Sequence, residues 1–139
     1  VDEEISRQLR NAIHPLSATF HRAFDVCEDP MEALDTVINL GYQRILSSGQ
    51  LMSAFEGRFV LAELVKAAGD KIIIMPGAGI NEGNLRELYK CTNAKEFHMS
   101  LRKSVNKDHC LESLNSNSTL MTIAGERIEA VMKIARELT

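Results

Sequence analysis

The sequence predicts an α/β fold built from parallel β/α units, and three observations lead to this prediction. Short apolar runs of strand length alternate with longer segments that carry apolar residues at helical spacing. The alternation recurs roughly every 25 residues, as expected of strands that are joined by helices. Each apolar run stops at a polar or glycine-containing cluster. Because the carboxyl ends of parallel strands share one edge of a sheet, these clusters should meet on one face.

The first expected element is an amphipathic helix whose apolar stripe consists of Ile5, Leu9 and Ile13. His14-Pro15 ends this helix, and residues 16–20 form the first expected strand. A second helix begins at Asp29-Pro30, because Asp29 is a favourable N-cap and Pro30 suits the first helical position. Gly41 is the expected end of this helix.

The next strand is expected at residues 44–46, and a helix follows at 54–68 with Gly69 as its stop. The strand at 71–75 contains three consecutive isoleucines, which is typical of a strand that is covered on both faces. A further helix begins after Asn81, and residues 94–99 form the last expected strand.

The remaining residues predict a loop and a helix. Residues 103–122 are rich in Asn, Ser and Lys and are expected to form a long loop. The final helix is predicted from an apolar stripe of Ala124, Ile128, Val131, Ala135 and Leu138. With 139 residues and 45% hydrophobic content, the chain fits a single domain with its own core.

Composition and charge argue against several classes of protein. The net charge is −3 and the basic residues are scattered, so no nucleic-acid partner is indicated. No run approaches the ~20 apolar residues of a membrane span, and the acidic start VDEEISRQL is unlike a signal peptide. Three cysteines at wide spacing indicate neither a disulfide framework nor a metal motif. We therefore expect a cytoplasmic protein, with the nucleus as a second location.

Four parallel strands make either a small open sheet or half of an eight-stranded barrel. A complete barrel typically needs ~250 residues, and this chain starts with a helix rather than a strand. The sequence is therefore expected to be a fragment. Because a half-barrel leaves two sheet edges and one apolar face exposed, self-association into a two-chain barrel is also expected.

The four strand-end clusters resemble motifs of the CutC family, the (β/α)8 barrel proteins of copper homeostasis. The string FHRAFD at residues 20–25 stands unchanged, and ILSSGQ at 45–50 resembles that family's ILTSGQ. MPGAGI at 75–80 resembles MPGGGI, and EFHMSLR at 96–102 resembles EFHGSAR. The resemblance implies that residues 1–139 are one partial domain, the C-terminal half of a CutC-like TIM barrel with helix four and β/α units five to eight.

The resemblance implies a copper homeostasis protein of the CutC type in truncated form, with Cu(I) as its cofactor. It implies no established enzymatic activity. The Cu(I) ligands proposed for the family are cysteines of its N-terminal half, so the metal ligands of this chain stay unknown. From the residues alone, His109 and Cys110 in the polar loop are candidate Cu(I) donors, with Cys91, Met99 and Met121 as further soft donors. The alternative is that the methionines fill the core.

The glycine-containing turn predicts an anion site. Gly77 and Gly79 let the backbone turn sharply and expose amides, and a helix N-terminus follows. We expect Gly77, Ala78, Gly79 and the backbone around Ser100 to form an anion cradle; the alternative is a turn that only reverses the chain. Two departures from the family motif weaken the cradle, since Ala78 and Met99 stand where the motif has glycine.

The string FHRAFD carries the residues for acid–base chemistry. Strand alternation would send His21 and Arg22 to opposite faces. His21 with Asp25 as its orienting carboxylate is a candidate general base, and Arg22 is a candidate anion ligand. The alternative is structural, with His21 in the interior and Arg22 paired to Asp25.

Glu96 and His98 should face the same side of the last strand, where Glu96 needs an arginine or histidine partner. His21 and His98 are then the best pair for proton transfer or metal ligation, although such pairs are more often satisfied core residues. The leading function is copper homeostasis, with a copper ion or a small anion as ligand. The alternatives are a TIM-barrel enzyme that acts on a small phosphorylated or carboxylated metabolite, and a truncated product with neither activity.

Overall fold

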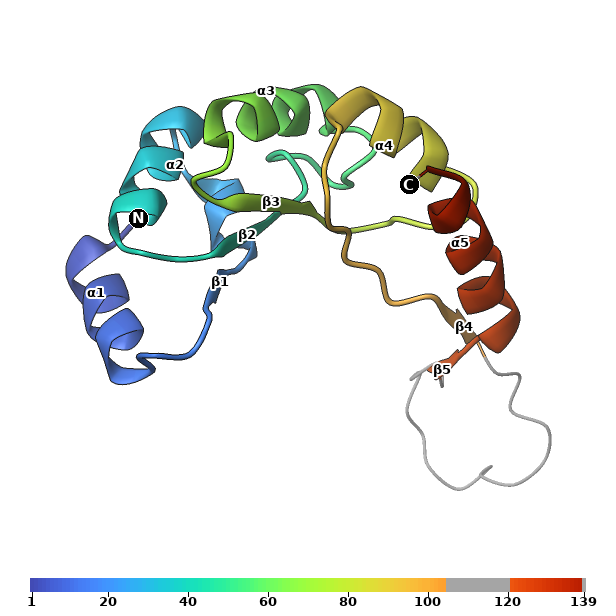
Figure 1. The fold of residues 1–139 in the computed structure, drawn as a ribbon, viewed down its shortest axis with the longest axis horizontal. Helices are drawn as coiled ribbons and strands as arrows, with labels where there is room; N and C mark the ends of the chain where they lie inside the picture. Colours follow the sequence, from blue (N-terminus) through green and yellow to red (C-terminus); the bar gives the residue numbers. More distant parts are fainter. Residues whose placement is uncertain (105–120, 139) are drawn as a thin grey trace, which may run out of the picture. The chain divides into compact units, whose positions relative to one another are not determined.

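The computed structural model describes residues 1–104 and 121–138 (Figure 1). The chain forms two compact units, Val1–Met99 and Ser100–Thr139. The first unit contains the parallel sheet and most of the helices, and the second contains a short antiparallel pair and the final helix. No helix in the described part of the chain is long and apolar enough to cross a membrane.

The first unit is organised by a three-stranded parallel sheet with strand order β1-β2-β3. The strands are β1 (Thr19–Phe20), β2 (Arg44–Ser47) and β3 (Ile73–Pro76). Ile45 of β2 pairs with Phe20 on one side and Ile74 on the other. The predicted parallel β/α order is therefore confirmed for these three strands.

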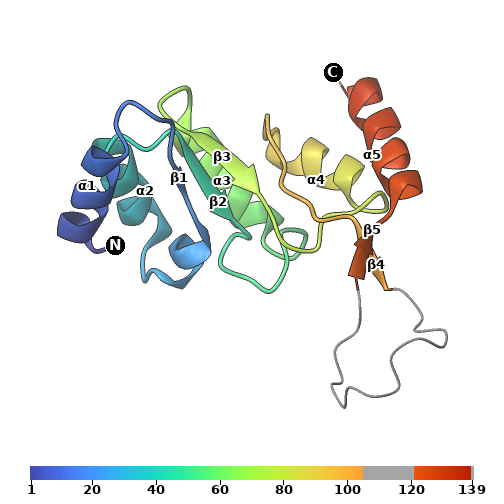
Figure 2. The ribbon, with the colours of Figure 1, turned by 90° about the horizontal axis from the view of Figure 1, so that it is seen from below.

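Four helices accompany this sheet: α1 (Glu3–Ala12), α2 (Pro30–Asn39), α3 (Arg58–Ala68) and α4 (Leu85–Thr92). Asp29 caps α2 as predicted, because its carboxylate accepts hydrogen bonds from the amides of Met31 and Glu32. Gly69 ends α3 with a positive φ of 53°, a conformation that glycine adopts without strain. Figures 1 and 2 show α2 and α3 on one side of the sheet.

The two faces of the sheet differ in burial. Ile45 and Ile74 point to the helices and are 0% and 3% exposed. The alternate residues Arg44, Leu46, Ile73 and Met75 lie on the other face, here called the open face, and each is only half-buried. The prediction that the isoleucine-rich strand is covered on both faces is therefore wrong for the described residues, because helices pack on one face alone.

Several predicted boundaries are also wrong. The first strand has two residues rather than five, because the Leu16 amide closes a turn onto the Ile13 carbonyl oxygen just before it; a 3-10 helix, η1 (Arg22–Val26), follows the strand. Helix α3 begins at Arg58 rather than at residue 54, because Gly57 lies against the backbone of Gly49 and the chain turns there. Residues 94–99 form no regular strand; a single parallel bridge joins His98 to Gly77.

The apolar stripe of α1 is exposed, although the helix itself is present as predicted. Ile5, Leu9 and Ile13 are 56%, 59% and 40% exposed. Polar contacts attach the helix instead: Arg10 Nε donates to the carbonyl oxygen of Gly41, and the Tyr42 hydroxyl lies 3.3 Å from the Ser6 carbonyl oxygen.

The second unit contains strands β4 (Arg102–Ser104) and β5 (Met121–Ile123), which pair antiparallel, and helix α5 (Gly125–Leu138). The predicted loop at 103–122 is therefore wrong at its two ends, and residues 105–120 lie outside the described part of the chain. The final helix is confirmed, and its stripe residue Val131 is buried.

Candidate functional site

Asp25 is the centre of a polar cluster that joins the carboxyl ends of β1 and β2. Its Oδ1 accepts hydrogen bonds from the Ser47 hydroxyl at 2.6 Å and the Ser48 amide at 3.0 Å. Its Oδ2 accepts from Arg22 Nε at 2.7 Å. The side chain is 7% exposed. Burial raises the pKa of Asp25, but the hydrogen bonds from Ser47, Arg22 and Ser48 outweigh it and hold the pKa below its ordinary value.

Arg22 is held at this strand end by two partners. Besides the bond of Nε to Asp25, its Nη2 donates to Ser48 Oγ at 2.7 Å. The predicted pairing of Arg22 with Asp25 is confirmed, whereas its predicted place in the strand is wrong because it lies in η1. The side chain is 44% exposed, and no acceptor in the described residues contacts Nη1. The guanidinium therefore presents one free donor edge to solvent.

His21 is exposed and has a local role in the backbone. Its Nδ1 accepts a hydrogen bond from the Ala23 amide at 3.0 Å, which starts η1. The hydrogen bonds of Asp25 among the described residues go to other partners, so the structure does not bring His21 and Asp25 together as base and orienting carboxylate. His98 is also exposed, and its amide donates to the Pro76 carbonyl oxygen. The catalytic roles of His21, Asp25 and His98 stay predictions.

The turn after β3 is only partly available as an anion cradle. The Gly77 amide donates to the Ser47 carbonyl oxygen at 2.9 Å, so the sheet uses it. The amides of Ala78 and Gly79 have no acceptor among the described residues. Ala78 has φ of +88°, the positive value that a motif glycine would adopt without strain. Ser100 belongs to the second unit.

Sequence reasoning missed the part of Ser47 and Ser48 in the Asp25 cluster, and it missed the glycine pair that shapes the loop after β2. A Cβ on Gly57 would lie 2.0 Å from the Ser48 carbonyl oxygen, and a Cβ on Gly49 would lie 2.3 Å from the Gly57 carbonyl oxygen. The sequence did contain a signal for this cluster. Ser47, Ser48 and Gly49 stand at the end of one predicted strand, and Asp25 stands after the end of the neighbouring strand.

Glu96 pairs with an arginine, Arg44, as predicted for a carboxylate in this position. Arg44 Nε and Nη2 donate to the two oxygens of Glu96 at 2.7 and 3.1 Å, and Arg44 Nη1 donates to Ser17 Oγ. This hydrogen bonding lowers the pKa of Glu96 and raises that of Arg44. Because Arg44 lies on β2, the pair reaches across β3 on the open face and fastens residues 94–98 to the sheet.

Soft metal donors are present but scattered. Cys27 and Cys91 are free thiols and half-buried, and burial raises the pKa of the Cys27 thiol. The described residues contain no group of three His, Cys, Asp or Glu side chains that could hold a metal ion. The side chains of His109, Cys110 and Met121 lie outside the described residues.

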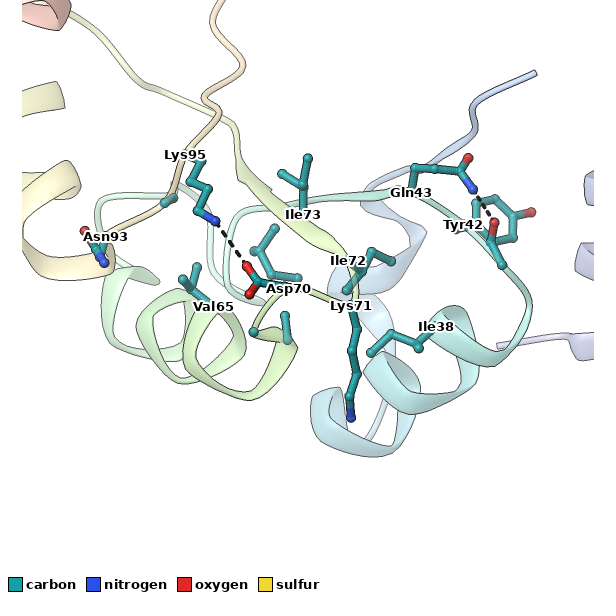
Figure 3. Close-up of a pocket in the computed structure, with 15 residues that line it drawn as sticks. Ile38, Tyr42, Gln43, Val65, Asp70, Lys71, Ile72, Ile73, Asn93 and Lys95 are labelled. Carbon is teal, nitrogen blue, oxygen red and sulfur yellow. Dashed lines mark hydrogen bonds and ion pairs between the residues drawn. The ribbon is translucent and has the colours of Figure 1, made fainter. Parts of the chain in front are cut away.

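A pocket of about 560 Å³ lies at the opposite, amino-terminal ends of β2 and β3 (Figure 3). Its walls are partly apolar, with Ile38, Val65 and Ile72 among the lining residues, and an exposed ion pair between Lys95 and Asp70 crosses its rim at 3.3 Å. None of the predicted site residues lines it. The candidate site therefore remains at the carboxyl ends of the strands.

Known proteins match most of this chain. Residues 1–103 match the model of the CutC family. A CutC family protein from Parabacteroides distasonis is 51% identical over 105 residues, 76% of this chain and 43% of that protein. A copper homeostasis protein cutC homolog from Mus musculus is 41% identical over 117 residues, 84% of this chain and 42% of that protein.

The crystal structure of CutC from Streptococcus agalactiae matches with a TM-score of 0.66 and 32% sequence identity. The match covers 70% of this chain and 49% of that one. The chain thus spans less than half the length of these relatives. The predicted fold, an α/β arrangement that corresponds to part of a TIM-type barrel, is confirmed.

Proposed function

The chain belongs to the CutC family, and from this premise we propose that it acts in copper homeostasis as a cytoplasmic, Cu(I)-binding protein. The observation that carries the proposal is the family match over residues 1–103, joined to relatives that are named for copper homeostasis. We further propose that its β/α units correspond to the last four of an eight-unit barrel. The coverage of 43% and 42% of two relatives supports this reading.

Cysteine thiolates are the donors that would bind Cu(I) in this chain, because Cu(I) prefers soft ligands. Cys27 and Cys91 are half-buried and form no disulfide. Neither belongs to a group of three potential metal ligands among the described residues. The Cys27 sulfur lies 3.5 Å from Gln50 Nε2 and the Cys91 sulfur 3.9 Å from the Arg58 carbonyl oxygen. Cys110 is the third cysteine of the sequence. Three separate sulfur positions can therefore be tested one at a time.

Competition for Cu(I) with a chromophoric chelator under anaerobic, reducing conditions tests this proposal on the full chain. We expect the chain to withdraw Cu(I) from the chelator and at least one of Cys27→Ser, Cys91→Ser and Cys110→Ser to lose that ability. Ser53→Ala is a control that removes a hydroxyl and no sulfur. A chain that leaves the chelator complex intact, while its circular dichroism shows it folded, would contradict Cu(I) binding.

The second candidate function is a barrel enzyme that binds a small phosphorylated or carboxylated metabolite at the strand ends. The observation that favours it is the free donor edge of Arg22, held in place by Asp25 and Ser48. The amides of Ala78 and Gly79, which have no acceptor among the described residues, lie at the end of the same sheet. A guanidinium and backbone amides are the groups that recognise phosphate and carboxylate.

Titration with inorganic phosphate, followed by NMR, tests this second candidate. We expect the amide signals of Ala78 and Gly79 and the Nε signal of Arg22 to shift, and Arg22→Gln to weaken the effect. Arg136→Gln, at an exposed position of α5, is the matched control and should leave the titration unchanged. Unmoved signals at both places would contradict an anion site. A thermal-shift screen of phosphorylated metabolites would then separate a true substrate class from phosphate itself.

A further inference from the structure

The turn after β3 lies directly beside residues 53–56, here called the capping segment, which carry an uncompensated carboxylate. We propose that the turn and the capping segment together bind a small zwitterion of the amino-acid class, with its carboxylate on the turn amides and its ammonium group on Glu56. This inference rests on the second candidate function, the binding of a small anionic metabolite at the strand ends. It narrows the substrate class from phosphorylated or carboxylated molecules to amino-carboxylates.

Two contacts place the capping segment against the turn. The Ala54 amide donates to the Ala78 carbonyl oxygen at 3.0 Å, and Ala54 is fully buried. A Cβ added to Gly79 would lie 3.3 Å from Ser53 Cβ. The two segments follow β2 and β3, which are hydrogen-bonded neighbours with β1 on one side and the bridge to His98 on the other. The juxtaposition therefore follows from contacts inside the described sheet.

The turn offers hydrogen-bond donors to a ligand. Its carbonyl groups are already used, because Ala54 donates to that of Ala78, and the side-chain amides of Asn81 and Asn84 donate to that of Gly79 at 3.1 and 3.0 Å. The amides of Ala78 and Gly79, in contrast, have no acceptor among the described residues. Gly79 is exposed, so a ligand can reach the turn. Free backbone amides of this kind are donors to a carboxylate.

The capping segment offers an acceptor that carries charge. Glu56 Oε2 accepts from the amide and the hydroxyl of Ser53, each at 3.0 Å, and the Glu56 amide donates back to Ser53 Oγ. Its Oε1 accepts no hydrogen bond from the described residues, and the side chain is exposed. The nearby guanidinium of Arg58 is engaged elsewhere, since Nη1 donates to the Phe55 carbonyl oxygen and Nε lies 3.8 Å from Glu87. Glu56 is thus anchored through one oxygen and presents the other, with its negative charge, to a ligand.

This combination of groups selects among ligands by their charge. A carboxylate on the turn amides lies near Glu56, which repels it, and a dianionic phosphate is repelled more strongly. An ammonium group on the same ligand turns that repulsion into an attraction. The short contacts that join Gly79 to Ser53 and Ser53 to Glu56 keep the amide and the carboxylate within about 10 Å of each other. A small amino acid with a hydrogen bond at either end spans such a distance.

Titration of the full chain at neutral pH, followed by NMR, tests the charge selection with four probes: glycine, acetate, methylammonium and inorganic phosphate. Glycine and acetate share a carboxylate and differ in the ammonium group. We expect the amide signals of Gly79 and Ser53 to reach half of their shift at a glycine concentration about threefold to fivefold lower than that of acetate, the ratio expected of one solvent-exposed ion pair. Phosphate and methylammonium should each require more than glycine.

Glu56→Gln removes the charge and keeps an oxygen that Ser53 can bind. It should raise the half-saturating glycine concentration to that of acetate, with unchanged circular dichroism. Glu63→Gln, which alters an exposed carboxylate on α3, is the matched control and should keep the preference for glycine.

The outcomes separate this inference from the function on which it rests. Equal responses of the wild type to glycine and acetate, or a preference for glycine that survives Glu56→Gln, overturn the zwitterion site. The second candidate function still stands in that case, provided that acetate or phosphate shifts the turn amides. Signals that stay unmoved with all four probes overturn both.

Discussion

The carboxyl ends of β2 and β3 are neighbours in the sheet, yet the loops that follow them are built in opposite ways. The loop after β2 is fixed by the buried carboxylate of Asp25, whose oxygens accept from Ser47, Ser48 and Arg22. The turn after β3 holds Ala78 at a positive φ and leaves two amides without an acceptor among the described residues. The loop after β2 also holds a non-glycine residue, Gln50, at a positive φ of 62°, so the feature that distinguishes the turn after β3 is its pair of free amide donors.

This difference separates a structural device from a candidate ligand site. Satisfied buried networks make a loop rigid, and the Asp25 cluster has the further effect of fixing Arg22 beside the strand ends. The amides of Ala78 and Gly79, by contrast, have no acceptor among the described residues, and free amides at a strand end are donors that an anion can use. We infer that the β2 loop supports the site and that the β3 turn would contact the ligand.

The largest effect is expected from Asp25→Ala, which breaks the supporting loop. The change leaves Arg22, Ser47 and Ser48 without their shared acceptor, and it should lower the free energy of unfolding by about 3 kcal/mol. Urea unfolding monitored by circular dichroism measures this loss. Asp70→Asn, which alters a carboxylate that is 96% exposed, is the control and should change the midpoint little. Equal, small effects of the two changes would show that the Asp25 cluster does not hold the loop.

Gly57→Ala tests the same loop through its backbone. The added Cβ would lie 2.0 Å from the Ser48 carbonyl oxygen, so the loop must move. We expect a loss of about 2 kcal/mol, a magnitude typical of overpacking. Gly125→Ala makes the same chemical change where no atom lies within 4 Å, and it should cost nothing or stabilise slightly. Thermal unfolding of the two variants side by side separates crowding from a general effect of alanine.

Ala78→Gly should act with the opposite sign, because it relieves strain in the turn after β3. Alanine at φ +88° is disfavoured relative to glycine, so the substitution should stabilise the chain by about 1 kcal/mol. Ala67→Gly, at an exposed position of α3, is the control and should destabilise by roughly 0.5–1 kcal/mol. If Ala78→Gly destabilises as Ala67→Gly does, Ala78 is not strained and the comparison of the two loops rests on their free amide donors alone.

The sequence was sufficient for features that depend on local chemistry. The alternation of apolar runs predicted the parallel units, and Asp29 with Pro30 predicted the start of α2, because caps act within one turn. The demand of Glu96 for a cationic partner was also predictable, since a carboxylate in that position needs a counter-charge. The identity of that partner, Arg44, was not, because the pair spans 52 residues in sequence and reaches across β3.

Features that depend on contacts between distant segments were missed. The five-residue strand predicted before His21 is short because the Leu16 amide closes a turn onto the Ile13 carbonyl oxygen, and the Ala18 amide donates to the side chain of Gln43, 25 residues away. The Gly49–Gly57 contact requires two loop segments to meet, and a linear pattern does not show it. The antiparallel pair β4–β5 joins residues on either side of a polar stretch that predicted only a loop.

The smallest effect is expected from Glu96→Gln, which loosens the segment beside the β3 turn and leaves both loops in place. Arg44 and Glu96 are each about a third exposed, at 32% and 34%, so solvent screens their attraction and the loss at pH 7 should be smaller than the gain from Ala78→Gly. The loss should also depend on pH. Because the pKa of folded Glu96 lies below its ordinary value of 4.5, the pair stabilises the fold above that pH and ceases to do so as the pH falls through the folded pKa.

Urea unfolding of wild type and Glu96→Gln at neutral pH, at pH 5 and under more acidic conditions should therefore give curves that differ at the two higher pH values and converge in acid. Lys95→Gln, which removes a neighbouring and more exposed ion pair, is the matched control and should give a smaller difference at neutral pH. A difference between wild type and Glu96→Gln that persists in acid would mean that the carboxylate acts through packing rather than through its charge. The segment 94–98 would then be held to the sheet mainly by the hydrogen bond from the His98 amide to the Pro76 carbonyl oxygen.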